Sequence, residues 1–467
     1  MDADVIVIGG GTAGLTAALA ARVEGASVTL IEAGPRIGGD CTFRGCVPSK
    51  ALIETARLAH ELARASEDGI ISEAPPLDFA AVMARKARIV EQIAADESDE
   101  RFTRAGIEVV HGRARFVDEH TVEAAGRTLR GTRFVIATGS RPRIPPISGL
   151  DTVPHLTNED VFELERLPSR LAVLGGGPTG LELAQAFQRL GSAVTVLENE
   201  QKLLRHDEPE AGELVATVLR GEGVDLRLQA RVVRVERPAA ETILHLDGGA
   251  TLACDALLVA AGRRGALEEL GIELALEDGY VKVDDRCRTS RPHVYAAGDV
   301  SGGLQFTHVA AHEGQVAGRN AAGRRARKRE RVVPRVTFLD PEVAHVGLTE
   351  AQARERHRRV QVLAFPLSDA DRARILERPV GFVKLVSAAR PLLGRLGGGV
   401  LVGAQVVGPR AGELIDECAL AMQTRCFAGR LAQTIHAYPT ASLALQQTEA
   451  QLTPVGRALA PAPGPEA

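Results

Sequence analysis

Val5-Ile6-Val7-Ile8-Gly9-Gly10-Gly11-Thr12-Ala13-Gly14 opens the chain as a continuous apolar run that passes directly into glycines. The residues that follow predict a helix over 15–24 and a second strand over 27–32, which ends in Glu32. Strand, G-x-G-x-x-G (Gly9, Gly11 and Gly14), helix, strand and acid together form the dinucleotide-binding fingerprint. The glycines let a pyrophosphate approach the helix N-terminus, and Glu32 can accept hydrogen bonds from ribose hydroxyls.

The same pattern occurs a second time. A strand over 171–174 leads into Gly175-Gly176-Gly177-Pro178-Thr179-Gly180, a helix through Leu190, and a strand over 194–197 that is followed by Glu198. The fingerprint glycines are Gly175, Gly177 and Gly180. We expect two bound nucleotides; one duplicated fold, or two glycine-rich turns without a ligand, are the alternatives.

Two cysteines five positions apart lie between the fingerprints, in Gly38-Gly39-Asp40-Cys41-Thr42-Phe43-Arg44-Gly45-Cys46-Val47-Pro48-Ser49-Lys50. In an undistorted helix such positions lie roughly 140° apart around the axis and about 7.5 Å apart along it. A disulfide wants Cα atoms within about 6.8 Å. A bridge from Cys41 to Cys46 therefore needs a broken turn, which Gly45 permits. Two unrelated buried thiols are the alternative.

Composition narrows the class of protein. The 467 residues predict two to four domains, and the net charge of −4 gives no reason to expect a nucleic-acid or membrane partner. No basic segment precedes the first strand, so we predict no signal peptide, and no apolar run reaches transmembrane length. Six cysteines without a secretory signal suggest a reducing compartment, so we predict a cytoplasmic protein.

The remaining elements predict an α/β fold with two Rossmann-like domains, the second inserted in the first, and a C-terminal α+β domain. Strands at 134–140 and 294–299, the second followed by a helix near Thr307, indicate that the chain returns to the first domain. Helices are expected at about 51–65 and 79–105, with strands at 107–110 and 113–117. The predicted domains are 1–150 with 279–330, 151–278 and 331–455, and the tail 456–467 is predicted to be disordered.

Residues 324–331 form a basic run with one acid, Arg324-Arg325-Ala326-Arg327-Lys328-Arg329-Glu330-Arg331. No aromatic residues interleave with these charges, and the chain as a whole is acidic. We interpret the run as a solvated connector rather than a nucleic-acid patch.

With the fingerprints and the cysteines in place, the chain resembles the flavoprotein pyridine nucleotide–disulfide oxidoreductases over essentially its whole length. The resemblance rests on residues 39–50, where Asp40 stands in place of the more common Thr, and on 137–140, 297–299 and 337–344. The last segment opens the family's dimer-forming domain. The resemblance therefore implies an FAD-dependent enzyme that uses NAD(P)H and forms a homodimer.

The resemblance also assigns roles. Cys46 would face the flavin, Cys41 would meet the acceptor, and Lys50 would lie near flavin N5, paired with Glu182; a surface lysine is the alternative for Lys50. The FAD residues implied are Gly9, Gly11, Gly14, Glu32, Lys50, Gly112, Thr138, Gly139, Ser140, Asp299, Gln305, Phe306, Thr307 and His308. The implied NAD(P) residues are Gly175, Gly177, Gly180, Glu198, Val232 and Gly262. Glu198 would repel a 2′-phosphate, so NADH is favoured, although Lys202 and Arg205 leave dual use open.

The chain departs from the family near its end. Disulfide-reducing members carry a His-Pro-Thr motif with a glutamate five residues after the histidine, where this chain has Tyr438 and Leu443. Tyrosine, with a pKa near ~10, is a poor base at neutral pH. Mercuric reductases also place a tyrosine here, which makes the chain mercuric-reductase-like. His436 is expected to be a packing residue, with a substitute base as the alternative, and Cys418 and Cys426 are expected in the core.

We consider four alternative functions. The first is reduction of a soft metal ion or a small thiol-reactive acceptor, in which Cys41 and Cys46 bind the substrate metal transiently. Tyr438 is included among the catalytic residues, and no structural metal is expected. The second is a disulfide reductase of the dihydrolipoyl type. The third is a diaphorase that reduces quinones or oxygen at the flavin, with the cysteines incidental, and the fourth is a non-catalytic flavin redox sensor.

Overall fold

The protein is described by a computed structural model that covers residues 1–73, 76–329, 332–390 and 398–451. The predicted tail, 456–467, lies outside the described residues. The chain divides into one unit of residues 1–175, 186–195 and 231–330, and a second unit of residues 176–185, 196–230 and 331–467. The finer predicted division into three domains and a tail stays a prediction.

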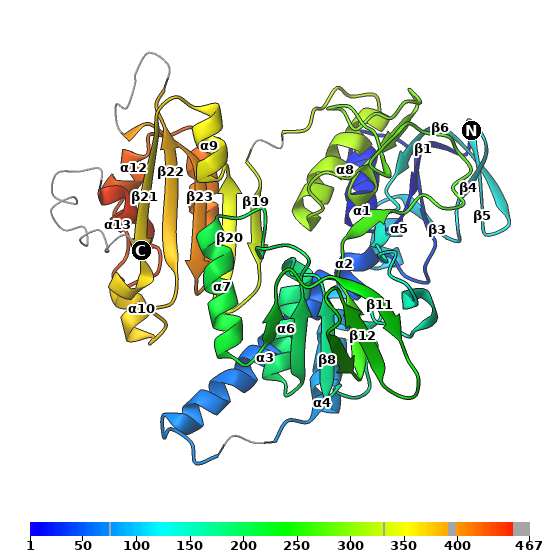
Figure 1. The fold of residues 1–467 in the computed structure, drawn as a ribbon. Coiled ribbons are helices and arrows are strands. Elements are labelled where there is room, and N and C mark those ends of the chain that lie inside the picture. The colour runs from blue at the N-terminus through cyan, green and yellow to red at the C-terminus, as the bar shows by residue number, and fades with distance from the viewer. Residues whose placement is uncertain (74–75, 330–331, 391–397, 452–467) are drawn as a thin grey trace. The chain divides into compact units, whose positions relative to one another are not determined.

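The first unit contains a seven-stranded sheet, some of whose strands are labelled in Figure 1. Its strands are β1 Ala3–Ile8, β2 Val28–Glu32, β3 Ile107–His111, β4 Arg115–Asp118, β5 Thr121–Ala124, β6 Arg127–Ile136 and β18 Val294–Ala296. The order is β3-β2-β1-β6-β5-β4, with β18 paired to β6; β4 and β5 join as antiparallel strands and the others are parallel. The pairing of β18 with β6 confirms the predicted return of the chain to its first sheet.

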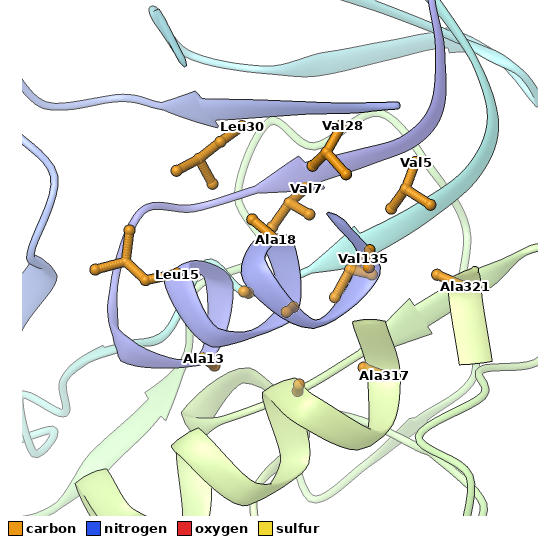
Figure 2. Close-up of a cluster of buried hydrophobic side chains, with 14 of the residues drawn as sticks. Val5, Val7, Ala13, Leu15, Ala18, Val28, Leu30, Val135, Ala317 and Ala321 are labelled. Atoms are coloured by element: carbon orange, nitrogen blue, oxygen red, sulfur yellow. The ribbon is translucent and has the colours of Figure 1, made fainter. Parts of the chain in front are cut away.

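Two helices, α1 (Thr12–Val23) and α8 (Thr307–Ala321), pack closely in the core of this unit. Figure 2 shows Val5, Val7, Val28 and Leu30 on the strands, and alanines on both helices. A Cβ on Gly318 would lie 2.1 Å from the carbonyl oxygen of Ala17, so the helix backbones touch. Alanine and glycine on the facing surfaces permit this approach.

The helices after the second strand differ in part from the prediction. The predicted helix 51–65 is longer and is α3 (Cys46–Glu67), preceded by the short α2 (Gly39–Phe43). The single helix predicted over 79–105 is wrong: it is α4 (Phe79–Ala94), a 3-10 turn at Ala95–Glu97 and α5 (Asp99–Arg104). Ser98 is extended, with φ −91° and ψ 152°, and Asp99 and Glu100 begin a new helix where acidic side chains are favoured.

The rest of the first unit is mostly strands. These are β7 Ser140–Pro142 paired with β15 Arg263–Gly265, β8 Arg170–Leu174 paired in parallel with β14 Ala256–Val259, the antiparallel β11 Val232–Glu236, β12 Thr242–Leu246 and β13 Thr251–Cys254, and the short β16 Leu276–Glu277 and β17 Tyr280–Val281. Helix α6 (Pro178–Arg189) and strand β9 (Ala193–Leu197) contribute residues to both units.

The second unit contains a five-stranded antiparallel sheet in the order β19-β20-β23-β22-β21. The strands are β19 Pro334–Thr337, β20 Glu342–Gly347, β21 Val360–Pro366, β22 Phe382–Ala388 and β23 Val400–Gly408. Its other elements are α7 Pro209–Gly221, β10 Asp225–Arg227, α9 Glu350–Arg356, α10 Asp371–Ile375, α11 Ala411–Gln423, α12 Gly429–Gln433 and α13 Leu443–Ala450. Helices α11 and α13 cover the sheet through a core that includes Val406, Ile415, Cys418 and Leu445. The predicted C-terminal α+β fold is confirmed, and Cys418 lies in its core as expected, whereas Cys426 is only partly buried against that core.

None of the helices in the described ranges is both long enough and apolar enough to cross a membrane.

Candidate active site

The first fingerprint forms a tight turn between β1 and α1. Gly9 has φ +109°, and a Cβ on Gly14 would lie 1.8 Å from the carbonyl oxygen of Gly9, so the turn requires both glycines. Glu32 accepts the backbone N–H of Gly10 at 2.6 Å with one carboxylate oxygen, and that of Gly34 at 2.6 Å with the other. A carboxylate has about four lone-pair positions, so Glu32 keeps capacity for two ribose hydroxyls.

The second fingerprint repeats this hydrogen bonding. Glu198 accepts the N–H of Gly176 at 2.6 Å with Oε2 and that of Glu200 at 2.8 Å with Oε1. Gly175 has φ +119°, as Gly9 does, and a Cβ on Gly177 would meet no described atom within 4 Å. The two turns therefore share the positive φ of their first glycine and the role of the acid.

The ends of three parallel strands bring further predicted residues to the first fingerprint. Ile8 pairs in register with Ile136, and Ile136 with Ala296, so the turns after β1, β6 and β18 lie at one edge of the sheet. Ser140 donates from Oγ to Asp299 Oδ2 at 2.6 Å, which joins the second turn to the third. Ligands of parallel α/β sheets bind at this edge.

The two cysteines lie where α2 ends and α3 begins. The helices break at Arg44 and Gly45, and a Cβ on Gly45 would lie 2.9 Å from the carbonyl oxygen of Asp40. Cys41 and Cys46 are both thiols, and their side chains are hydrogen-bonded to one another. Lys50 follows Cys46 by one helical turn on α3, so the two residues share a helix face.

Thr307 contacts both sulfur atoms. Its Oγ1 lies 3.2 Å from Cys46 Sγ and donates to Cys41 Sγ at 3.3 Å. Thr307 is the first residue of α8, and a helix N-terminus favours a thiolate nearby. The hydrogen bond to Cys46, burial and the charges of Cys46 and Glu97 nevertheless raise the pKa of the Cys41 thiol. The family resemblance implies that Thr307 lies against the flavin, but nothing in the sequence indicates its contact with both cysteines.

Ion pairs and hydrogen bonds fix the residues on either side of Cys41. Arg263 is paired with Asp40 and donates to Ser140 Oγ at 2.6 Å and to Asn158 Oδ1 at 3.0 Å. On the other side, Thr42 Oγ1 donates to Glu97 Oε2 at 2.7 Å. The sequence gives a partial signal for Arg263, because it follows the predicted Gly262, but it does not indicate that Asp40 is its partner.

The remaining residues predicted for the FAD side lie in the first unit. Thr138 donates from Oγ1 to the carbonyl of Ala266 at 2.6 Å, and Gly139 has φ +75°. The Gly112 N–H donates to the carbonyl of Glu32 at 2.8 Å. The rings of Phe306 and His308 stack at 5.4 Å, just after Gln305. Of the residues predicted for NAD(P), Val232 begins β11, Gly262 has φ +105°, and Gly180 lies in α6.

His111 supports the loop that follows Glu32, a role the sequence did not suggest. Its Nε2 lies 2.6 Å from Asp99 Oδ2, and its Nδ1 lies 2.8 Å from the carbonyl oxygen of Gly34. The hydrogen bond to Asp99 and that to Gly34 raise the pKa of His111 above its ordinary value.

We expect the stability contributed by His111 to be lost at alkaline pH. A histidine whose pKa is raised in the folded protein stabilises the fold in its protonated form. This stabilisation is complete below the ordinary histidine pKa, about 6.5, and is lost as the pH rises through the raised pKa. The Tm difference between wild type and His111→Gln, measured from pH 5 to pH 9, should therefore shrink with increasing pH. His155→Gln is the control, because its ring contacts the Val153 carbonyl. A difference that grows with pH would contradict this.

Glu182 and Tyr438 belong to the second unit. Glu182 is buried on α6 and accepts the N–H of Phe338 at 2.7 Å, and its pairing with Lys50 stays a prediction. Tyr438 is 68% exposed and donates from its hydroxyl to Asp371 Oδ2 at 3.1 Å. The hydrogen bond to Asp371, together with its charge, raises the pKa of Tyr438, so the phenol stays protonated at neutral pH and is a weaker proton donor than free tyrosine.

His436 is hydrogen-bonded at both ring nitrogens. Its Nδ1 lies 3.0 Å from the carbonyl oxygen of Thr434, and its Nε2 lies 2.9 Å from Glu417 Oε1. Leu443 begins α13 and supplies no carboxylate. The histidine–acid pair of this segment is therefore His436 with Glu417, and not the residues at positions 438 and 443.

Comparison with known proteins identifies the family. The family model described as pyridine nucleotide-disulphide oxidoreductase matches residues 3–314, and that of the family's dimerisation domain matches residues 333–448. The chain belongs to the pyridine nucleotide-disulphide oxidoreductase family. The resemblance drawn from the sequence is thus confirmed, as is the prediction of an enzyme of this FAD-dependent class with NAD(P)H as electron donor.

Relatives of this family with different names match over most of their length. A mercuric reductase of Streptomyces lividans is 37% identical over 457 residues, covering 95% of this chain and 94% of the relative. A dihydrolipoyl dehydrogenase of Geobacillus stearothermophilus is 34% identical and covers 97% of both. The solved Cu(II) complex of the HOCl-induced flavoprotein disulfide reductase RclA from Escherichia coli has a TM-score of 0.84 at 29% identity, covering 94% of this chain and 98% of that one.

The residues at the sheet edge fit FAD as the family requires. The atom nearest to a Cβ built on Gly11 would be the Cα of Gly39, at 3.7 Å, so backbone can approach a pyrophosphate there. Glu32 has lone pairs free for a ribose, and Cys46, which the flavin would face, is exposed.

Proposed function

We propose that this family member is a mercuric-reductase-like enzyme that passes electrons from NAD(P)H through FAD and the Cys41–Cys46 pair to a soft metal ion or a small thiol-reactive acceptor. The observation that carries the proposal is the pair of adjacent thiols, Cys41 and Cys46, which both contact the hydroxyl of Thr307. In addition, Tyr438 stands where disulfide-reducing relatives have a catalytic histidine, and its hydroxyl is hydrogen-bonded to Asp371. The relatives named mercuric reductase and the Cu(II) complex of RclA support the choice of a metal ion.

The chain's own residues would hold the cofactor and the redox pair. Gly9, Gly11, Gly14 and Glu32 would bind the adenosine pyrophosphate part of FAD, and Asp299 its ribityl or phosphate part. When bound, FAD accepts a hydride from NAD(P)H and supplies the electron pair for the dithiol and its acceptor. Lys50 would place a positive charge on the Cys46 face of α3, which stabilises a thiolate. Thr307 would donate to whichever sulfur carries the negative charge.

A soft metal ion suits this site because it requires less proton transfer than a disulfide. Opening an organic disulfide releases a thiolate that a general acid must protonate, and Tyr438 has its proton engaged with Asp371. A soft cation instead binds two thiolates directly, from Cys41 and Cys46. The two electrons that reduced FAD would supply then reduce the ion, and Cys41 and Cys46 are released as thiolates.

A dihydrolipoyl-dehydrogenase-type disulfide reductase is the second candidate. The hydrogen bond between His436 and Glu417 favours it, because a histidine paired with a carboxylate is the usual acid/base group of such enzymes. The bond of Nδ1 to the Thr434 carbonyl opposes it, since the ring then has no nitrogen left for a substrate.

We also propose a homodimer, supported by the match to the family's dimerisation domain, and a cytoplasmic location, where free thiols persist.

The nicotinamide cofactor is proposed to be NADH. Glu198 would place a negative charge beside a 2′-phosphate, so kcat/KM for NADH is expected to exceed that for NADPH by at least about tenfold. Glu198→Gln removes the charge but keeps an acceptor for Gly176 and should reduce this ratio. Steady-state kinetics with both nucleotides check this. A higher kcat/KM for NADPH, assisted by the exposed Lys202 and Arg205, would contradict it.

The acceptor is tested by NADH oxidation with Hg(II) plus excess thiol, with lipoamide and with a quinone. We expect Hg(II) to be turned over fastest and lipoamide slowly. Rapid lipoamide turnover would favour the second candidate. Turnover of the quinone alone would mean that the cysteines are incidental.

A further inference from the structure

The basic connector over 324–329 is not wholly solvated, contrary to the prediction. Lys328 donates from Nζ to Glu313 Oε1 at 2.8 Å, and their side chains are 19% and 5% exposed. The neighbouring Arg327 is 61% exposed and pairs with Asp285 at the surface. One lysine of the run thus reaches a buried carboxylate, while the residue beside it behaves as predicted.

The other oxygen of Glu313 holds the turn after β18. Glu313 Oε2 accepts the N–H of Gly298 at 2.8 Å and the hydroxyl of Ser301 at 3.2 Å. Gly298 has φ +77°, and a Cβ there would lie 2.8 Å from the Cβ of Ala13, so this turn is tightly fitted against α1. The turn carries Asp299, which accepts from Ser140.

Backbone hydrogen bonds hold the connector in place independently of the lysine ammonium. The Lys328 N–H donates to the carbonyl of Asp285 at 2.7 Å, and the Ala326 N–H donates to Asn320 Oδ1 at 2.7 Å. The Arg329 N–H donates to His312 Nε2 at 3.1 Å. Removing the charge of Lys328 therefore leaves the path of the chain supported.

We infer that Lys328 is a positioning residue for the flavin, acting through Glu313 on the turn that carries Asp299. A buried carboxylate without a cation is costly, so it takes up a proton or moves toward water. Either response weakens the acceptor that fixes Gly298 and Ser301, and Asp299 loses its placement. The inference rests on the proposed role of Asp299 in binding FAD.

The test is the rate at which the holoenzyme releases FAD, followed by the recovery of flavin fluorescence after dilution. Lys328→Met removes the charge at similar length and is expected to release FAD at least about tenfold faster than wild type. Arg327→Met is the matched control, since it removes a neighbouring surface charge, and should release FAD at the wild-type rate. The double variant Lys328→Met/Glu313→Gln removes both charges and should recover most of the difference.

Equal FAD release rates for wild type and Lys328→Met would overturn the inference. It would also be overturned if Arg327→Met accelerated FAD release as much as Lys328→Met does. A double variant that releases FAD as fast as Lys328→Met would overturn the charge argument, because general damage to the fold is not repaired by a second substitution. A wild-type chain that binds no FAD would overturn the proposed function itself. If wild type binds FAD and Lys328→Met releases FAD at the same rate as wild type, only this inference is overturned.

Discussion

Cys41→Ser is expected to reduce Hg(II)-dependent NADH oxidation by at least about a thousandfold, the scale on which removal of a reacting nucleophile acts. Serine is nearly isosteric with cysteine and can keep the hydrogen bond to Thr307. It is a much weaker ligand for a soft metal, and it cannot form a disulfide with Cys46. Loss of activity would therefore report the chemistry of the sulfur rather than a change in shape.

Two measurements separate this effect from damage to the rest of the enzyme. Stopped-flow reduction of the bound flavin by NADH should stay within about threefold of wild type, because that step precedes the dithiol. Cys426→Ser, a change at a partly exposed cysteine in the second unit, is the control and should retain full metal-dependent activity. Unchanged Hg(II) turnover in Cys41→Ser would show that electrons leave by a route that does not use the cysteine pair.

The second large effect is expected at Lys384 on β22, within the second unit. Its ammonium is buried and contacts Glu208 at 3.0 Å, Glu210 at 2.8 Å and Glu350 at 2.9 Å. Glu208 is itself buried, so one cation neutralises a carboxylate that cannot reach water. These partners come from the start of α7 and from α9, which makes the lysine a link between elements distant in sequence.

Lys384→Met should lower the free energy of unfolding of this unit by about 3–5 kcal/mol, as is typical when one partner of a buried ion pair is removed. Urea denaturation followed by circular dichroism measures the change. Lys282→Met is the control: Lys282 is 59% exposed, its pair with Glu277 spans 3.6 Å, and the expected loss is below about 1 kcal/mol. Equal losses in the two variants would show that the Lys384 cluster contributes no more than a surface pair.

The parts of the fold that follow local rules could be predicted from the sequence. Each dinucleotide-binding fingerprint is one continuous segment of sequence, with its glycines at the turn and its glutamate at the end of the next strand. The conformation of the turn therefore follows from local steric constraints. The break between α4 and α5 could not be predicted in this way. The residues around Ser98 are compatible with a continuous helix. Asp99 and Glu100 favour the N-terminus of a helix at this point but do not require one.

The contacts that complete the site join residues far apart in the chain. Arg263 meets Asp40 across 223 positions, and Thr307 meets Cys41 across 266. Sequence periodicity contains no information about contacts between such distant residues. Asp40 could therefore be recognised as an unusual residue at a position where the family more often has Thr, but Arg263 could not be predicted as its partner. The lack of aromatic residues and the acidic charge of the chain predict a solvated run, and only the buried position of Glu313 distinguishes Lys328 from its neighbours.

The pairing of β18 with β6 has a consequence for the order in which the protein is made. During synthesis, β6 leaves the ribosome well before β18 and α8, which complete its sheet edge and cover α1. At about 5–20 residues per second, this interval lasts on the order of ten seconds. For that time the nascent chain exposes an unpaired strand edge and the alanine face of α1, which are surfaces that chaperones bind. The first unit therefore cannot complete its folding until the segment inserted within it has been synthesised.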